Sequence, residues 1–211
     1  MTTHLGLQRI LLPSAQVSSL TTGSITLPSA RGAFETASFE AIASTLVGSG
    51  GQGTITFSSI PATYTHLQIR VHAQSNRATY NRDEWRLTFN GDSGANYSWH
   101  GFYGNMTTAS ATGGISQNHI LGQDILGANG FWGNAIIDVH DYANTNKYKS
   151  VKFLGGLDTN NGGVGGFNGA IDMYGGNWRS ASAITSISFV PSSGTLFTQY
   201  SRFSLYGIKD S

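Results

Sequence analysis

Residues 138–141 bring two carboxylates and an imidazole close together, in the order Asp138-Val-His140-Asp141. Carboxylates and imidazoles bind metal ions and exchange protons, so the fragment is a candidate for hard-metal or acid–base chemistry. In a strand, the period of two would place Asp138 and His140 on the same outer face, with Val139 inward. The alternative is a solvated strand edge followed by a turn. We favour this alternative because no second fragment supports the chemistry.

Two glycine-rich segments match functional motifs by letter. Residues 91–94, Gly-Asp-Ser-Gly, are similar to the nucleophile motif of trypsin-like proteases, but that chemistry needs an upstream histidine and a buried aspartate in a setting that this sequence lacks. Residues 48–53, Gly-Ser-Gly-Gly-Gln-Gly, fit the dinucleotide pattern G-x-G-x-x-G. A dinucleotide site requires a following helix, whereas residues 54–57 are typical of a strand. We expect turns at both segments and no catalytic residue, cofactor or metal site.

The strongest local signal is a run of aromatic residues from Tyr97 to Tyr103. Aromatic faces can stack on sugar rings, but large aromatic side chains also fill cores and subunit interfaces, and we favour this second role. Alternation places Tyr97 and Trp99 on one face of a strand and His100 and Phe102 on the other. The candidate glycan or interface contacts are Tyr97, Trp99, His100, Phe102, Tyr103, Trp132 and Trp178.

The composition narrows the class of protein. Charged residues make up 11% of the 211 residues and the net charge is +1, whereas nucleic-acid binding needs clustered Lys and Arg. Three Glu and four Lys are too few for a helical protein. The polar residues are instead mostly uncharged, with 25 Ser, 21 Thr and 14 Asn, and there are 28 Gly. The absence of Cys excludes disulfides and thiol nucleophiles. No apolar run approaches the roughly 20 residues that a membrane span needs. We therefore expect a Gly-rich β protein without nucleic-acid partners or membrane insertion.

The elements that would position these residues are short strands. Residues 65–73 and 84–90 alternate cleanly between apolar and polar side chains, and Asn90-Gly91-Asp92 is a strong turn signal. Further strands are expected at residues 38–47, 54–57, 97–103, 134–139, 150–154, 169–174, 184–190 and 202–208. This pattern predicts an all-β protein, a jelly-roll-like antiparallel β-sandwich. Most glycines then lie in turns, and those at 155–156, 162–166 and 175–176 are expected in long loops.

The N-terminal segment differs in composition from the rest. Residues 1–47 contain no Asn and three Gly, and Pro13 and Pro28 interrupt the first part. This predicts an extended arm at residues 1–33, followed by the sandwich at residues 34–211. A terminus that nothing holds is usually disordered, and we expect a neighbouring subunit to hold this arm.

Three blocks of sequence occur in a fixed order: residues 53–70 (GTITFSSIPATYTHLQIR), 87–100 (LTFNGDSGANYSWH) and 201–208 (SRFSLYGI). Together they resemble a type of tailed-bacteriophage virion protein, including ones found in cyanophages and other marine phages. The resemblance covers roughly residues 34–208, and it rests on the three blocks occurring together in this order. It implies a jelly-roll-like structural component of the virion, such as a tail fibre, a head fibre or a capsid decoration protein, and it brings no catalytic residues.

The expected function is therefore a non-enzymatic virion component that assembles with itself, as a trimer, and contacts capsid or tail proteins. Few Lys and Glu suit close subunit packing, and closed symmetry is the norm among homo-oligomers. The alternative is a receptor-binding module that recognises a host cell-surface glycan. A polysaccharide-degrading enzyme is a distant third, because no carboxylate pair stands out. The residues expected to dock the arm to the virion are Leu5, Ile10, Leu11, Leu12 and Leu27.

Overall fold

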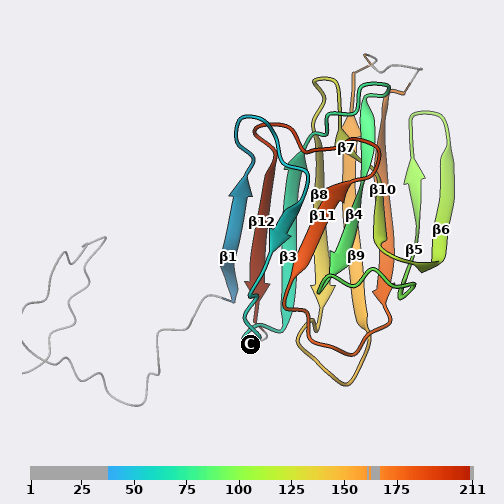
Figure 1. Cartoon of the computed structure of the whole chain (residues 1–211). Helices are drawn as coiled ribbons and strands as arrows, with labels where there is room; N and C mark the ends of the chain where they lie inside the picture. The colour runs from blue at the N-terminus through green and yellow to red at the C-terminus, as the bar shows by residue number, and fades with distance from the viewer. Residues whose placement is uncertain (1–37, 161, 163–166, 210–211) are drawn as a thin grey trace, which may run out of the picture. The chain divides into compact units, whose positions relative to one another are not determined.

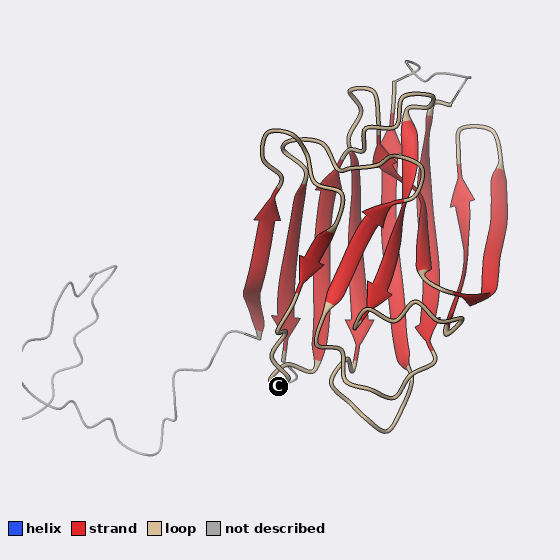
Figure 2. Cartoon of the chain, viewed as in Figure 1, coloured by secondary structure: helices blue, strands red, loops and turns tan. Residues whose placement is uncertain are grey.

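The computed structural model describes residues 38–160, 162 and 167–209, with the backbone alone at residues 123–125. These residues form twelve strands and no helix (Figure 2). The strands are β1 (Phe39–Leu46), β2 (Ile55–Phe57), β3 (His66–Ala73), β4 (Arg82–Phe89), β5 (Tyr97–Gly104), β6 (Ala109–Gln117), β7 (Ile120–Gly127), β8 (Gly133–His140), β9 (Lys149–Asp158), β10 (Gly169–Trp178), β11 (Ile187–Pro191) and β12 (Arg202–Ile208). The expected arm at residues 1–33, with its five docking residues, lies outside the described residues.

Two antiparallel sheets face each other as a sandwich (Figure 1). The larger sheet has the order β1-β12-β3-β8-β9-β10-β5-β6, and the smaller sheet has the order β2-β11-β4-β7. When β5, β6, β9 and β10 are set aside and the other eight strands are renumbered along the chain, the orders become 1-8-3-6 and 2-7-4-5. These are the two sheets of a jelly roll. The predicted all-β, jelly-roll-like sandwich is confirmed.

Two hairpins inserted into the jelly roll lengthen the larger sheet. The β5–β6 hairpin lies between β4 and β7 along the chain, and the β9–β10 hairpin lies between β8 and β11. Their strands join in the order β8-β9-β10-β5-β6 and form one end of the sheet (Figure 1). No residue of β6 is buried. The strand at this end of the larger sheet therefore exposes both of its faces.

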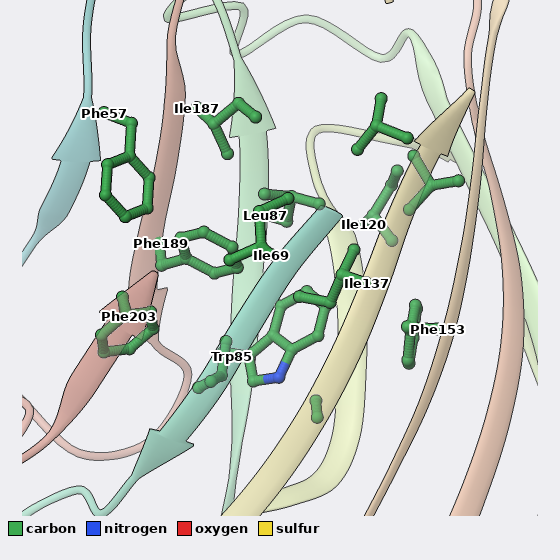
Figure 3. Packing of buried hydrophobic residues seen from close by; sticks show 14 of the residues in the cluster. Phe57, Ile69, Trp85, Leu87, Ile120, Ile137, Phe153, Ile187, Phe189 and Phe203 are labelled. Atoms are coloured by element: carbon green, nitrogen blue, oxygen red, sulfur yellow. The ribbon is translucent and has the colours of Figure 1, made fainter. Parts of the chain in front are cut away.

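The core is built from aromatic and branched side chains between the sheets (Figure 3). The Trp85 ring centroid lies 5.1 Å from that of Phe153 and 5.5 Å from that of Phe189. Phe153 in turn stacks on Tyr174, with centroids 4.9 Å apart. These rings come from β4, β9, β10 and β11, so they join the two sheets. Aromatic pairs at such distances add to the stabilisation that burial provides.

All ten expected strands are present, with ends shifted by a few residues. The set of predicted strands was incomplete, however, and one prediction about the glycines is wrong. Strands β6 and β7 were not predicted. The glycine pairs at 155–156 and 175–176 lie inside β9 and β10 rather than in loops. Of the glycines expected in a loop at 162–166, all but Gly162 lie outside the described residues. Neighbouring atoms lie too close to two of the glycines in β9 and β10 for a larger side chain to fit. A Cβ at Gly156 would lie 2.7 Å from the Ala170 carbonyl oxygen, and one at Gly176 would lie 2.9 Å from Ile120 Cδ1.

Gly122→Ala should destabilise the sandwich, because a methyl group at this position of β7 would overlap the buried Trp85 ring. Overpacking of this kind costs about 1 to 3 kcal/mol, so the urea midpoint should fall clearly. Gly175→Ala is the matched control, since a Cβ there meets no atom within 4 Å. An unchanged midpoint for the Gly122 variant would contradict the packing described for Trp85.

Candidate functional site

The aromatic run at residues 97–103 is divided between the two faces of β5, as alternation predicted. Tyr97 and Trp99 point into the core and are buried. His100 and Phe102 point outward and are exposed. Tyr103 is half-buried and lines a hollow of about 280 Å³. Among these residues, the outward side chains and Tyr103 are available to a ligand or a subunit.

Trp178 also belongs to the interior, and this corrects part of the predicted site. Its ring is buried and stacks on Tyr97 at a centroid distance of 6.3 Å. Its Nε1–H donates a 2.7 Å hydrogen bond to a carboxylate oxygen of Asp92. Tyr97, Trp99 and Trp178 offer no free face to a sugar or a subunit, because all three side chains are buried. They have the core role that the sequence left open.

Trp132 is half-buried at the outer face of the larger sheet. Its ring stacks on the exposed imidazole of His72, with centroids 5.2 Å apart and planes 16° apart. The strand register places Arg202 and Asn134 on either side of His72. This cluster of an aromatic ring, an imidazole, a guanidinium and an amide has the kinds of group that recognise sugars. The sequence singled out Trp132 but not its neighbours, which come from three different strands.

The outer face of the larger sheet carries a second feature, a row of apolar side chains across four strands. The register pairs Ile136 with Leu154, Leu154 with Met173, and Met173 with Phe102. Together with Ile171 and Met106 beside it, we call this surface the apolar strip. Its exposed fractions are Ile136 43%, Leu154 50%, Met173 38%, Phe102 55%, Ile171 68% and Met106 78%. Single exposed apolar residues are ordinary, but a contiguous group marks an interaction surface.

Glycines shape a hollow of about 590 Å³ along the apolar strip. Gly156 and Gly104 flank Ile171 in the register, and neither places a side chain beside it. The hollow is lined by Met106, Ile136, Leu154 and Ile171, by the amides of Asn105, Asn134 and Asn168, and by Asp158 among others. Its lining therefore combines apolar side chains with hydrogen-bonding groups. Of the predicted contacts, Phe102 alone belongs to the apolar strip.

The Asp138–Asp141 fragment lies on β8 and the turn that follows it. Asp138 and His140 share the outer face with Val139 inward, as predicted. Asp138 accepts a 3.0 Å hydrogen bond from Gln68 Nε2. Asp141 forms an ion pair with Lys147, which lowers the pKa of this carboxyl. Among the described residues, no three His, Cys, Asp or Glu side chains are grouped so that they could hold a metal ion.

The two glycine-rich motif segments form turns. Residues 48–53 are followed by strand β2 rather than by a helix, so the geometry of a dinucleotide site is missing. At the start of the Gly91–Gly94 segment, Asn90 and Gly91 have φ values of 54° and 67°. The Asp92 N–H donates a 2.9 Å hydrogen bond to the Phe89 carbonyl. Two consecutive positive φ values identify a type I′ turn, and turn chemistry accounts for both motifs.

Asp92→Asn should destabilise the fold at neutral pH by about 1 kcal/mol, because a charged acceptor for Trp178 is lost. Hydrogen bonds, first from Trp178 and then from Gly94 and Asn96, lower the pKa of the Asp92 carboxyl below its usual 3.8, against an opposing effect of burial. A lowered pKa stabilises the folded state above the usual pKa, and this contribution is lost as the pH falls through the lowered pKa. Urea titrations should therefore show a difference between wild type and variant that shrinks below about pH 4. A difference independent of pH would contradict this role.

Comparisons with known proteins identify no relative. No protein-family model, no curated protein and no solved structure matches this chain. Within the described residues, no helix is long and apolar enough to span a membrane. The function is therefore inferred from the surfaces of this chain and from its three sequence blocks.

Proposed function

We propose that this protein is a structural component of a tailed-phage virion, either a fibre-like appendage or a capsid decoration protein, anchored through residues 1–33. The observation that carries this proposal is the jelly-roll strand order, found in a chain with the three sequence blocks at 53–70, 87–100 and 201–208. Jelly rolls recur in viral capsid proteins. Because a fold by itself does not determine a function, the surfaces must support the proposal as well.

Several carboxylates support a non-enzymatic role, because they hold structural hydrogen bonds. Asp83 is buried and accepts hydrogen bonds from the N–H groups of Ser193 and Gly194, at 3.1 and 2.8 Å. Glu40 accepts a 2.9 Å hydrogen bond from the Tyr64 hydroxyl. Hydrogen-bonded carboxylates of this kind fix loops and strand ends, as do Asp92 and the Asp138–Asp141 fragment.

The surfaces support assembly. The apolar strip lies on the inserted hairpins and on the adjacent strand β8, and the uncharged strand β6 forms the end of the same sheet. Lys and Glu are depleted at protein interfaces, and this chain has only four Lys and three Glu. We propose that the chain assembles with itself, as a homotrimer, and with other capsid or tail proteins.

The proposal predicts where the protein is found and which segment attaches it. Antibody labelling of purified phage particles should place the chain on the shell or on the tail. A chain without residues 1–33 should keep the circular dichroism spectrum of the sandwich, because the twelve strands of the described residues all begin after this segment, but it should no longer join particles. Normal incorporation of the truncated chain would overturn the anchoring role, and absence of the full chain from particles would overturn the proposal.

Recognition of a host cell-surface glycan is the second candidate, and the stack of Trp132 on His72 is the observation that favours it. An aromatic platform next to the amide of Asn134 and the guanidinium of Arg202 resembles the chemistry of lectin sites, and lectins also use jelly rolls. Binding on a glycan array should be lost in Trp132→Ala. It should persist in Phe102→Ala, which removes an outward ring elsewhere on the same sheet. Absence of binding in the wild type would exclude this candidate.

A further inference from the structure

The apolar strip leaves a large area uncovered. If a fully exposed large side chain presents roughly 200 Å², the fractions given above correspond to on the order of 600 Å² of apolar surface. This lies at the upper end for the largest patch on an ordinary monomer. It also approaches the roughly 800 Å² that each partner buries in a standard protein interface. The area is therefore suited to one folded partner rather than to a short peptide.

Strand β6 continues the strip to the end of the sheet. It pairs with β5 on one side, and its sequence from Ala109 to Gln117 contains neither a charged residue nor a proline. Natural edge strands are commonly protected by charges, by proline or by their shortness. Strand β6 has neither charges nor proline, and with nine residues it is not short. Ala111 lies opposite Phe102 in the register, so the edge and the apolar strip form one continuous surface.

The charges beside the strip favour a partner with the same surface. In the neighbouring row of the outer face, Asp138 on β8 lies directly opposite Lys152 on β9. Arg70 on β3 is exposed opposite Ile136, and Asp158 lines the hollow. A face that carries both acids and bases next to an apolar centre is complementary to a copy of itself, since each base can meet an acid of the other copy. A polyanion would need clustered basic residues. A glycan would need more aromatic rings than Phe102, the single ring of the strip.

We propose that a second copy of this chain covers the apolar strip and lies along the edge of β6. The contact buries Leu154, Met173 and Phe102 of each copy at its centre. This inference rests on the self-association in the proposed function and names one surface that carries it. A contact between two like surfaces pairs two copies, so a trimer would need a further contact. The residues concerned come from the inserted hairpins and from β8, so the strands at the opposite end of the larger sheet are not part of the contact.

The oligomeric state of the full chain in solution tests the proposal, measured by sedimentation velocity over a range of concentrations. The wild type should be an oligomer. Leu154→Glu should weaken self-association by at least about tenfold, because the contact would bury an unpaired carboxylate. Leu46→Glu is the matched control: it changes the same residue type, with 53% exposure against 50%, on β1 of the same sheet, and it should leave the oligomer intact. Equal urea midpoints for both variants would show that each folds.

The chain contains no cysteine, so single cysteines report proximity directly. Ala111→Cys on β6 should be joined between copies by a short bismaleimide, whereas Ala43→Cys on β1 should not. A monomeric wild type, or an oligomer that withstands Leu154→Glu, would overturn the proposal. So would an oligomer that is lost only when residues 1–33 are removed. If association depends on Leu154 but the protein is absent from phage particles, the inference stands and only the proposed function fails.

Discussion

The sandwich depends on how Trp85 fits between its two sheets. The indole projects from β4 of the smaller sheet, packs against Phe153 of the larger sheet and lies over Gly122 of β7. Because a side chain at residue 122 would occupy the same space, the glycine allows the fully buried Trp85 ring to pack against its neighbouring strand. From Trp85 the ring contacts continue through Phe189 to Phe203 on one side and through Phe153 to Tyr174 on the other. The separation and alignment of the sheets follow from these contacts.

The same constraint determines which side chains are left for function. Rings that face the core are buried by packing. The side chains that can contact a ligand or a partner are therefore those that alternate with these rings and point to the outer face. Four of the eight jelly-roll strands form one end of the larger sheet, while the β5–β6 and β9–β10 hairpins add four strands at the other. Three residues of the apolar strip's central row, and the uncharged edge, belong to these added strands. The candidate interaction surface is thus a property of the insertions, whereas the jelly roll supplies the support on which they lie.

The sequence was informative wherever one face of a strand is buried. Alternation in residues 65–73 and 84–90 predicted strands with large apolar side chains facing the core, and these strands are β3 and β4. Strand β6, ASATGGISQ, has no buried face, so its sequence shows no such alternation and gave no signal. The glycines of β9 and β10 were misleading for a related reason. Turns favour glycine, but so does close packing of one strand on another, and composition does not distinguish these two uses. Gly156, whose Cβ would meet the Ala170 carbonyl, illustrates the second.

The candidate surfaces were harder to predict than the strands. Period two assigned Trp99 and Phe102 to opposite faces of β5, and this is correct, but it could not tell which face is the core. That choice depends on pairing between distant strands: Phe102 becomes part of an apolar surface only because β10 places Met173 beside it and β9 places Leu154 beside Met173. Each of these residues alone is an unremarkable exposed side chain. The information that makes them a surface lies in the register, which long-range contacts determine.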